Sequence, residues 1–152
     1  MIYIAHRGLF NGPDVNLENR PQQVELALSE GYHAEIDVWF EDEKWYLGHD
    51  FPDYLISYEF LQQPNLWIHA KNLLALNVLG ADSDMNYFWH QGDDHTLTSQ
   101  KYIWTQPGKK LIHDSIMVMP EYIDKTFNNT LNVNCYAICS DYVEKIKELR
   151  CD

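Results

Sequence analysis

The sequence predicts an α/β fold, in which a mainly parallel sheet or barrel alternates with helices. Two observations support this. Apolar, strand-forming runs take turns along the chain with segments of helical periodicity, and cap and turn residues separate them. The length fits one domain, expected to span 1–152. A complete eight-unit barrel needs about 250 residues, so a barrel here would have to lose helices or strands.

The first elements form a β-α-β unit. Residues 2–5 and 34–40 are the predicted strands, because both runs are rich in strand-forming residues. Between them, Asn19 opens a capping-box pattern and Pro21 lies in the first turn of a predicted helix. Gly31 is expected to end this helix in a left-handed conformation.

The alternation continues through the rest of the chain. Further strands are predicted at 45–48, 66–71, 87–91, 101–105, 116–119 and 135–139. Further helices are predicted at 72–79, 121–127 and 142–149. Strands and helices that alternate in this way favour parallel pairing with helical crossovers.

Composition excludes several classes of protein. With 45% apolar and 14% aromatic residues, the chain can bury a core and is not disordered. Its net charge of −12 argues against binding nucleic acid or an anionic membrane through a broad basic face. The first apolar run is too short for a signal peptide and no membrane-spanning run occurs, so a cytoplasmic protein is expected. The cysteines (Cys135, Cys139 and Cys151) are expected to be reduced, without a function.

Two carboxylates share one face of the second predicted strand. Side chains alternate along a strand, so Glu35 and Asp37 point to one side while Ile36, Val38 and Phe40 pack on the other. Two like charges this close in a buried site raise one carboxyl pKa strongly unless they share a cation, and oxygen ligands suit a hard divalent metal ion. The alternative is an edge strand with both acids in water.

His6, Arg7 and Gly8 directly follow the first strand, where α/β folds collect functional groups. A histidine there can act as a general acid or base, an arginine can bind phosphate or carboxylate, and glycine lets a ligand approach the backbone. The alternative is a partly buried histidine bonded to a carbonyl group.

Later segments add similar groups. His49 is followed by Asp50, which can fix the tautomer of its ring. On the strand at 66–71, His69 and Lys71 share a face and can join the same cavity, unless they form a solvated strand end. His90 is expected to be a surface or core histidine rather than a further ligand.

Taken in order, these motifs resemble the glycerophosphodiester phosphodiesterase family, within the wider phospholipase C-like phosphodiesterases. That family carries His-Arg-Gly after its first strand, Glu-Asn at its first helix, a Glu-x-Asp-Val strand and then His-Asp. The matching residues here are His6-Arg7-Gly8, Glu18-Asn19, Glu35-Ile36-Asp37-Val38 and His49-Asp50. Four ordered matches within the first fifty residues make the resemblance specific.

The later match is looser. The family has Glu-x-Lys on the next strand, a late Trp-Thr and a closing apolar-Thr-Asp-Tyr, where this chain has His69-Ala70-Lys71, Trp104-Thr105 and Ile138-Cys139-Ser140-Asp141-Tyr142. His69 replaces the glutamate that the family uses as a third metal ligand. The resemblance implies Mg²⁺ or Ca²⁺, and imidazole shifts the preference toward softer ions such as Mn²⁺ or Zn²⁺.

The resemblance implies a metal-dependent phosphodiester hydrolase acting on a small phosphodiester. It assigns residues by role: general acid and base to His6 and His49, metal binding to Glu35, Asp37 and His69, substrate binding to Arg7, Lys71 and Trp104, and support of these groups to Glu18, Asn19 and Asp50.

The resemblance also implies a trimmed or distorted TIM-type (β/α) barrel with fewer helices. The chain has roughly 100 residues fewer than such barrels, so the loops that recognise the alcohol group are largely missing. We therefore expect an open pocket, or one completed by another subunit of a homo-oligomer. Two alternatives remain: a non-catalytic module that binds phosphorylated small molecules, favoured by His69 and the short chain, and a structural α/β domain with coincidental motifs.

Overall fold

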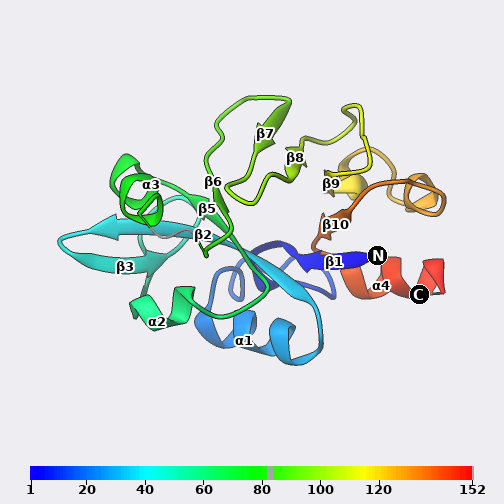
Figure 1. Ribbon diagram of the computed structural model, residues 1–152. Helices are drawn as coiled ribbons and strands as arrows, with labels where there is room; N and C mark the ends of the chain where they lie inside the picture. The colour runs from blue at the N-terminus through cyan, green and yellow to red at the C-terminus, as the bar shows by residue number, and fades with distance from the viewer. Residues whose placement is uncertain (82–83, 152) are drawn as a thin grey trace.

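The computed structural model describes residues 1–81 and 84–151 (Figure 1). The strands in these residues are β1 (Ile2–Ala5), β2 (His33–Glu41), β3 (Lys44–Leu47), β4 (Tyr54–Ile56), β5 (Leu66–Ala70), β6 (Tyr87–Phe88), β7 (His95–Leu97), β8 (Ile103–Thr105), β9 (Ser115–Val118) and β10 (Ala137–Ser140). The helices are α1 (Pro21–Ser29), α2 (Tyr58–Leu61), α3 (Leu73–Leu79) and α4 (Val143–Arg150), with short 3₁₀ helices η1 (His6–Gly8), η2 (Pro120–Tyr122) and η3 (Asn128–Thr130).

All strands belong to one curled sheet. Its main path runs β4-β3-β2-β1-β10-β9-β8-β7, and β5 and β6 continue from the other edge of β2. The pairs β1–β2, β2–β5, β5–β6, β1–β10, β9–β10 and β8–β9 are parallel. The pairs β2–β3, β3–β4 and β7–β8 are antiparallel. The sheet is therefore a half-barrel of mixed strand direction.

The expectation of a trimmed TIM-type (β/α) barrel is wrong. Among the described residues the curled sheet ends in antiparallel hairpins, and only four α-helices accompany its strands. Asp42 and Glu43, with φ of 48° and 60°, form a two-residue connection between β2 and β3. Such a connection gives a hairpin, whereas a parallel crossover needs a dozen residues or more. The chain thus forms hairpins where a barrel would need helical crossovers.

Helix α1 begins differently from the prediction. Pro21 is its first residue, and Arg20 occupies the N-cap without a side-chain cap bond. The capping-box prediction at Asn19 is therefore wrong: Asn19 has a φ of 57° and its side chain bonds to Asp37 on β2 instead. Gly31 has a φ of 84°, which confirms the predicted left-handed end of the helix.

The helix predicted at 121–127 is also wrong. Only the 3₁₀ turn η2 forms there in the described chain, after Met119 with a φ of 45°. The Asp124 carboxylate accepts hydrogen bonds from the backbone N–H groups of Thr126 and Asn129. A side chain that bonds the local backbone in this way competes with helix formation.

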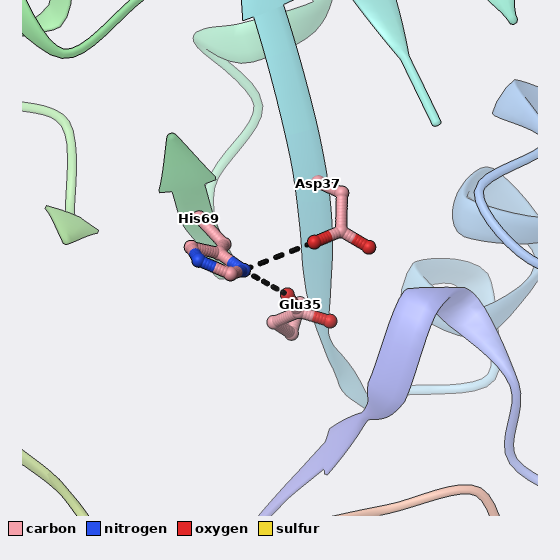
Figure 2. Close-up of side chains that lie close together, drawn as sticks. All are labelled: Glu35, Asp37 and His69. Atoms are coloured by element: carbon pink, nitrogen blue, oxygen red, sulfur yellow. Dashed lines mark hydrogen bonds and ion pairs between the residues drawn. The ribbon is translucent and has the colours of Figure 1, made fainter. Parts of the chain in front are cut away.

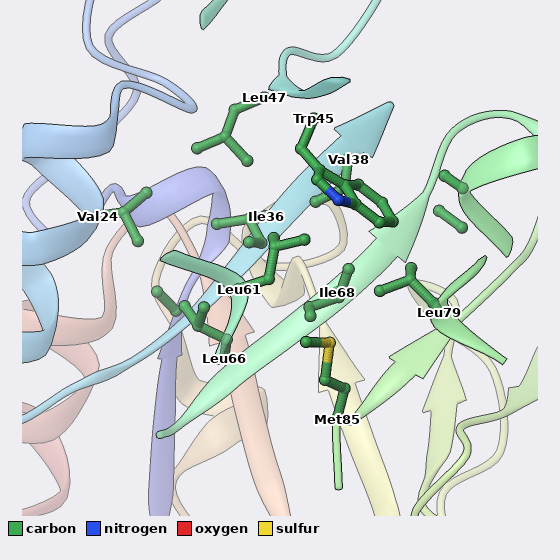
Figure 3. Close-up of a cluster of buried hydrophobic side chains, with 13 residues drawn as sticks. Val24, Ile36, Val38, Trp45, Leu47, Leu61, Leu66, Ile68, Leu79 and Met85 are labelled. Carbon is green, nitrogen blue, oxygen red and sulfur yellow. The ribbon is translucent and has the colours of Figure 1, made fainter. Parts of the chain in front are cut away.

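Apolar side chains pack on both faces of the sheet. A cluster between β2, β3 and β5 and helices α1 to α3 includes Ile36 and Val38, both fully buried (Figure 3). On the concave face, a second cluster includes Trp67, Phe88 and Trp104. Because Ile36 and Val38 point toward the helices, the alternate residues of β2 point into the concave face. None of the described helices has the length and apolar character to cross a membrane.

Candidate functional site

The candidate site lies on the concave face, where neighbouring parallel strands end. His6 and Arg7 belong to η1, directly after β1, and Glu35 and Asp37 lie on β2. His69 lies on β5, and its Cα pairs in register with that of Asp37. Register therefore brings residues that are distant in sequence onto one face.

Glu35, Asp37 and His69 form a buried group that can hold a metal ion (Figure 2). One ligand atom from each lies within 4.8 Å of the others. The His69 Nδ1 atom is 3.0 Å from Asp37 Oδ1 and 3.9 Å from Glu35 Oε1. Two carboxylates and one imidazole are a common donor set for divalent ions.

The two carboxylates differ in their electrostatic surroundings. Burial, and then the neighbouring charge of Asp37, raise the pKa of Glu35. Burial acts in the same direction on Asp37, but the hydrogen bond to His69 and the charges of His69, Lys71 and Arg7 outweigh it and hold the pKa of Asp37 well below its usual range. Nearby positive charges and hydrogen bonds therefore offset the effect of burial on Asp37 more than they do on Glu35.

Asp37 is held by several partners. Lys71 Nζ and Arg7 Nε each lie 3.3 Å from one of its carboxylate oxygens. The Asn19 amide donates to Asp37 Oδ2 at 2.9 Å and accepts from the Asp37 backbone N–H at 3.0 Å. Arg7 also donates to Glu18 at 2.8 Å. Arg7 and Lys71, expected to bind substrate, are therefore ion-paired within the site, while Asn19 and Glu18 support these groups by direct contact.

The carboxylates that contact the residues of this site are Glu18, Glu35, Asp37 and Asp141. The positive groups opposite them are Arg7 and Lys71, together with His6 and His69 when these histidines are protonated. A histidine that binds a metal ion must be a neutral imidazole, and with His69 neutral the carboxylates exceed the positive charges. A bound divalent cation would balance that negative charge, so the donor set and the charge both fit such an ion.

His6 has a partner to which the sequence prediction gave no role. Its Nδ1 atom lies 2.8 Å from Asp141 Oδ1. Burial alone would lower the pKa of His6, but the Asp141 hydrogen bond and the charges of Glu35 and Asp141 outweigh it and raise the pKa. Ala5 of β1 lies opposite Ser140 of β10, so the residues that follow them, His6 and Asp141, lie side by side. A prediction that pairs the first strand with the last would therefore identify Asp141 as the partner of His6.

His49 follows Gly48 at the end of β3. Its Nδ1 atom is 2.8 Å from the carboxylate of Asp50, as predicted from their adjacency. Burial, followed by the positive charge of Arg7, lowers the pKa of His49. A neutral imidazole is therefore favoured here, in contrast to His6.

One cavity of about 200 Å³ brings most of the predicted residues together. Its predicted lining residues are His6, Arg7, Glu35, Asp37, His49, His69 and Trp104. Residues without a predicted role also line it, among them His90, Gln106 and Tyr122. Lys71 instead lines a second cavity of about 360 Å³, which shares His49, His69 and His90 with the first. A larger cavity of about 430 Å³, around Trp67 and Tyr102, contains none of the predicted residues.

His90, expected at the surface or in the core, lies beside His69. The two rings stack with centroids 4.7 Å apart, and Phe88 stacks at 5.1 Å from His69. Burial and the charges of His69 and Lys71 lower the pKa of His90 to about 4. These neighbouring rings fix the orientation of His69, which directs Nδ1 toward the carboxylates.

In comparisons with protein-family models, curated proteins and solved structures, no match to this chain was found. The chemistry of the site is therefore the basis for a function. That chemistry combines a buried group that can hold a metal ion with two histidines whose pKa values shift in opposite directions.

Proposed function

We propose that the protein is a metal-dependent phosphodiester hydrolase of the glycerophosphodiester phosphodiesterase type. One observation carries this proposal: His6, His49 and the group formed by Glu35, Asp37 and His69 line the same cavity. Phosphodiester cleavage needs a base for the attacking hydroxyl, an acid for the departing oxygen, and positive charge near the non-bridging oxygens. The cavity contains candidates for each requirement.

Glu35, Asp37 and His69 would hold the metal ion. A divalent ion bound there supplies Lewis-acid stabilisation of the phosphate oxygens. His69 would bind through Nδ1, because Nε2 lies 3.4 Å from the carbonyl oxygen of His90 and can donate its proton there. A nitrogen ligand beside two carboxylates favours Mn²⁺ or Zn²⁺ over Mg²⁺ or Ca²⁺.

The two histidines divide the proton transfers. His6, whose pKa is raised, holds its proton more firmly than an ordinary histidine and would donate it to the departing alcohol oxygen. His49, whose pKa is lowered, is neutral and would accept the proton of the attacking water or substrate hydroxyl. Asp141 holds the His6 ring through Nδ1, which leaves Nε2 as the atom that carries the transferred proton.

The remaining residues position the substrate. Arg7 lines the cavity and would bind a non-bridging phosphate oxygen. Glu18 fixes the guanidinium through a 2.8 Å hydrogen bond to Nη1. Trp104, buried against Phe88 with ring centroids 4.5 Å apart, forms a rigid wall of the cavity.

The test is hydrolysis of bis(p-nitrophenyl) phosphate and glycerophosphocholine in the presence of Mn²⁺, Zn²⁺, Mg²⁺, Ca²⁺ or EDTA. We expect metal-dependent turnover that falls by about 100-fold or more in His6→Ala and Glu35→Gln. His113→Ala is the matched control, because His113 is exposed and pairs only with its neighbour Asp114 among the contacts described for it. Folded protein without turnover in any ion would contradict the proposal.

A second candidate function is a non-catalytic module that binds phosphorylated small molecules. Its supporting observation is that Lys71 and Arg7 already ion-pair with Asp37, which lessens the need for a metal ion. Such a module would bind inorganic phosphate or a phosphate monoester in EDTA without turnover. Calorimetric titration with phosphate in EDTA, beside the hydrolysis assay, distinguishes the two functions.

A further inference from the structure

A cavity of about 430 Å³ lies at the opposite end of the sheet from the candidate site. Its lining includes His33 and Trp67, near the beginning of β2 and β5, and Asn86, Tyr102 and Tyr136, which directly precede β6, β8 and β10. The candidate site lies where parallel strands end, whereas this Trp67 cavity lies where they begin. None of the described residues that line it lines the proposed catalytic cavity. Its volume is that of a small-molecule site.

Aromatic and aliphatic side chains form the inner wall of the Trp67 cavity. Its buried lining residues are all apolar: Leu61, Leu66, Trp67, Ile68 and Met85. The Trp67 and Tyr102 rings have centroids 5.3 Å apart, and Tyr136 stacks on Tyr102 at 4.2 Å. The hydroxyl groups of these two tyrosines share a hydrogen bond of 2.9 Å, which fixes both rings. A rigid wall of this kind favours a ligand with a flat apolar face.

The charge of the Trp67 cavity excludes an anionic ligand. Its described lining residues include no lysine or arginine, and exposed Asp84 adds a negative charge. Burial lowers the pKa of His33, so this ring is neutral at pH 7. A nucleotide phosphate or a strand of nucleic acid would therefore meet no positive charge here.

Polar groups of the same cavity can bond to the edge of an uncharged ring. Trp67 Nε1 donates to His33 Nδ1 at 3.2 Å, so the proton of the neutral His33 ring is on Nε2, which is a donor. Asn86 Oδ1 is buried without a hydrogen-bond partner in the described chain, so a ligand donor that reached it would satisfy an unpaired acceptor. The amides of Gln62 and Asn65 add further donors and acceptors.

We propose that the Trp67 cavity binds the base of a nucleoside, stacked on its aromatic wall and held through the polar edge of the base. A nucleobase combines two apolar faces with an edge of donors and acceptors, and a nucleoside has no phosphate. A monosaccharide lacks the flat apolar faces, and an organic cation offers no acceptor to the His33 and amide donors. The inference is independent of the proposed hydrolase, because the two cavities share no described lining residue.

The experiment follows the indole N–H signals of the isotope-labelled full chain by NMR during titration with adenosine, guanosine, cytidine and uridine. We expect at least one nucleoside to bind with a Kd of about 1 mM or below and to shift the Trp67 signal, which Trp67→Phe assigns. The signal of Trp39, whose Nε1 donates to the carbonyl oxygen of Gly48, should not shift. Tyr102→Leu should weaken binding by about fivefold, because it removes an aromatic ring of the wall. Tyr46→Leu is the matched control, because half-buried Tyr46 of β3 does not line this cavity.

Failure of all four nucleosides to bind would overturn the inference. A shift of the Trp39 signal without one of the Trp67 signal overturns it as well, since the nucleoside then lies near Gly48. Glucose and tetramethylammonium chloride are titrated in the same way, and tighter binding of either than of every nucleoside contradicts the assigned ligand. Equal binding by Tyr102→Leu and Tyr46→Leu contradicts stacking on the wall. If Tyr102→Leu does not fold, the Trp67 signal of the unaltered chain decides the assignment.

Discussion

Glu35 and Asp37 are buried two positions apart on β2, where ionisation of both requires nearby positive charge. Alternation along the strand predicted that they share a face. It could not predict that Lys71 and Arg7 both contact Asp37, because those contacts depend on side-chain conformations. Glu35 Oε2 accepts a hydrogen bond from the backbone N–H of Arg7 at 3.1 Å, and Arg7 has a φ of 52°. Because Lys71 and Arg7 form their ion pairs with Asp37, a bound cation would stabilise the ionised form of Glu35 more than that of Asp37.

Asp141→Asn is expected to lower the pKa of His6. Both the hydrogen bond from the His6 ring and the negative charge of Asp141 contribute to the raised pKa of His6, and the amide removes the charge. A raised pKa stabilises the fold below the usual value of 6.5, and this stability is lost as pH rises through the folded-state pKa. The variant should therefore lose more stability at pH 6 than at pH 9.

The measurement is an NMR titration of the imidazole protons, with urea unfolding at both pH values. Asp114→Asn provides the control, because Asp114 pairs with exposed His113 at 2.9 Å. An unchanged His6 titration in Asp141→Asn would show that Asp141 does not set its protonation.

Glu121→Gln is expected to stabilise the protein near pH 7. Burial raises the pKa of Glu121, and its Oε2 atom is buried without a hydrogen-bond partner in the described chain. A raised carboxyl pKa gives stability below the ordinary value of 4.5 that is lost as pH rises through the folded-state value. The neutral amide avoids this loss and can keep Oε1 as the acceptor for Ser140 and Asp141.

The expected gain is about 1 kcal/mol at pH 7 and close to zero at pH 4. Urea unfolding at both pH values measures it. Glu25→Gln, an exposed position on α1, should show no comparable pH dependence. A gain that is larger at pH 4 would have the wrong sign for a buried carboxyl with a raised pKa.

Among the elements, helix α3 was predicted closely because both of its ends have local signals. Helix α3 begins where the Asn72 side chain accepts from the Ala75 N–H and ends at Gly80, and both signals are visible in the sequence. The resemblance implies a hairpin at 42–48, and Asp42 and Glu43 form its two-residue turn, although these residue types are unusual at two consecutive positive φ angles. Strands β4 and β7, at three residues each, are too short to show alternation.

Gly48→Ala is expected to destabilise the element that carries His49. A Cβ atom at Gly48 would clash with the carbonyl oxygen of Phe51, and the residue has a φ of 153°. Because that neighbour is backbone, the chain around His49 must move, and we expect a loss of at least about 2 kcal/mol. Gly31→Ala is the matched control: its φ is 84°, but a Cβ atom there meets no atom within 4 Å.

Thermal and urea unfolding of both variants measures the difference. Gly31→Ala should cost only the strain of a left-handed alanine, about 1 kcal/mol. Equal losses in the two variants would mean that the clash at Phe51 is relieved without cost, and that the segment before His49 is not rigid.

At the scale of the whole molecule, the sequence predicted which faces are buried but not how far the sheet closes. Pairing of β1 with β10 joins the two ends of the chain and places Asp141 beside His6. Pairing of β6 with β5 likewise brings His90 beside His69. Neither contact has a local signal, since both depend on pairings between distant segments. The residues predicted on β1, β2 and β5 meet because they need only neighbouring strands.

Binding of a metal ion is expected to stabilise the whole fold. Glu35, Asp37 and His69 lie together only in the folded chain, so the ion has little affinity for the unfolded state. At a concentration of about one hundred times the Kd, the free energy of unfolding should rise by about 2.7 kcal/mol. Thermal unfolding with Mn²⁺, Zn²⁺, Mg²⁺ or EDTA measures this gain, and the inferred ligand set places Mn²⁺ and Zn²⁺ above Mg²⁺.

Substitutions of the metal ligands, and of Lys71, which competes with a cation for Asp37, distinguish metal binding from a general effect of salt. Glu35→Gln and His69→Leu should abolish the gain, because each removes one of the ligands. Lys71→Met should keep or increase it, since Lys71 Nζ, 3.3 Å from Asp37 Oδ1, competes with a cation for this oxygen. The same variant would weaken phosphate binding in a non-catalytic module, so opposite responses to Lys71→Met distinguish the two proposed functions. A gain that persists in Glu35→Gln would place the ion at another site.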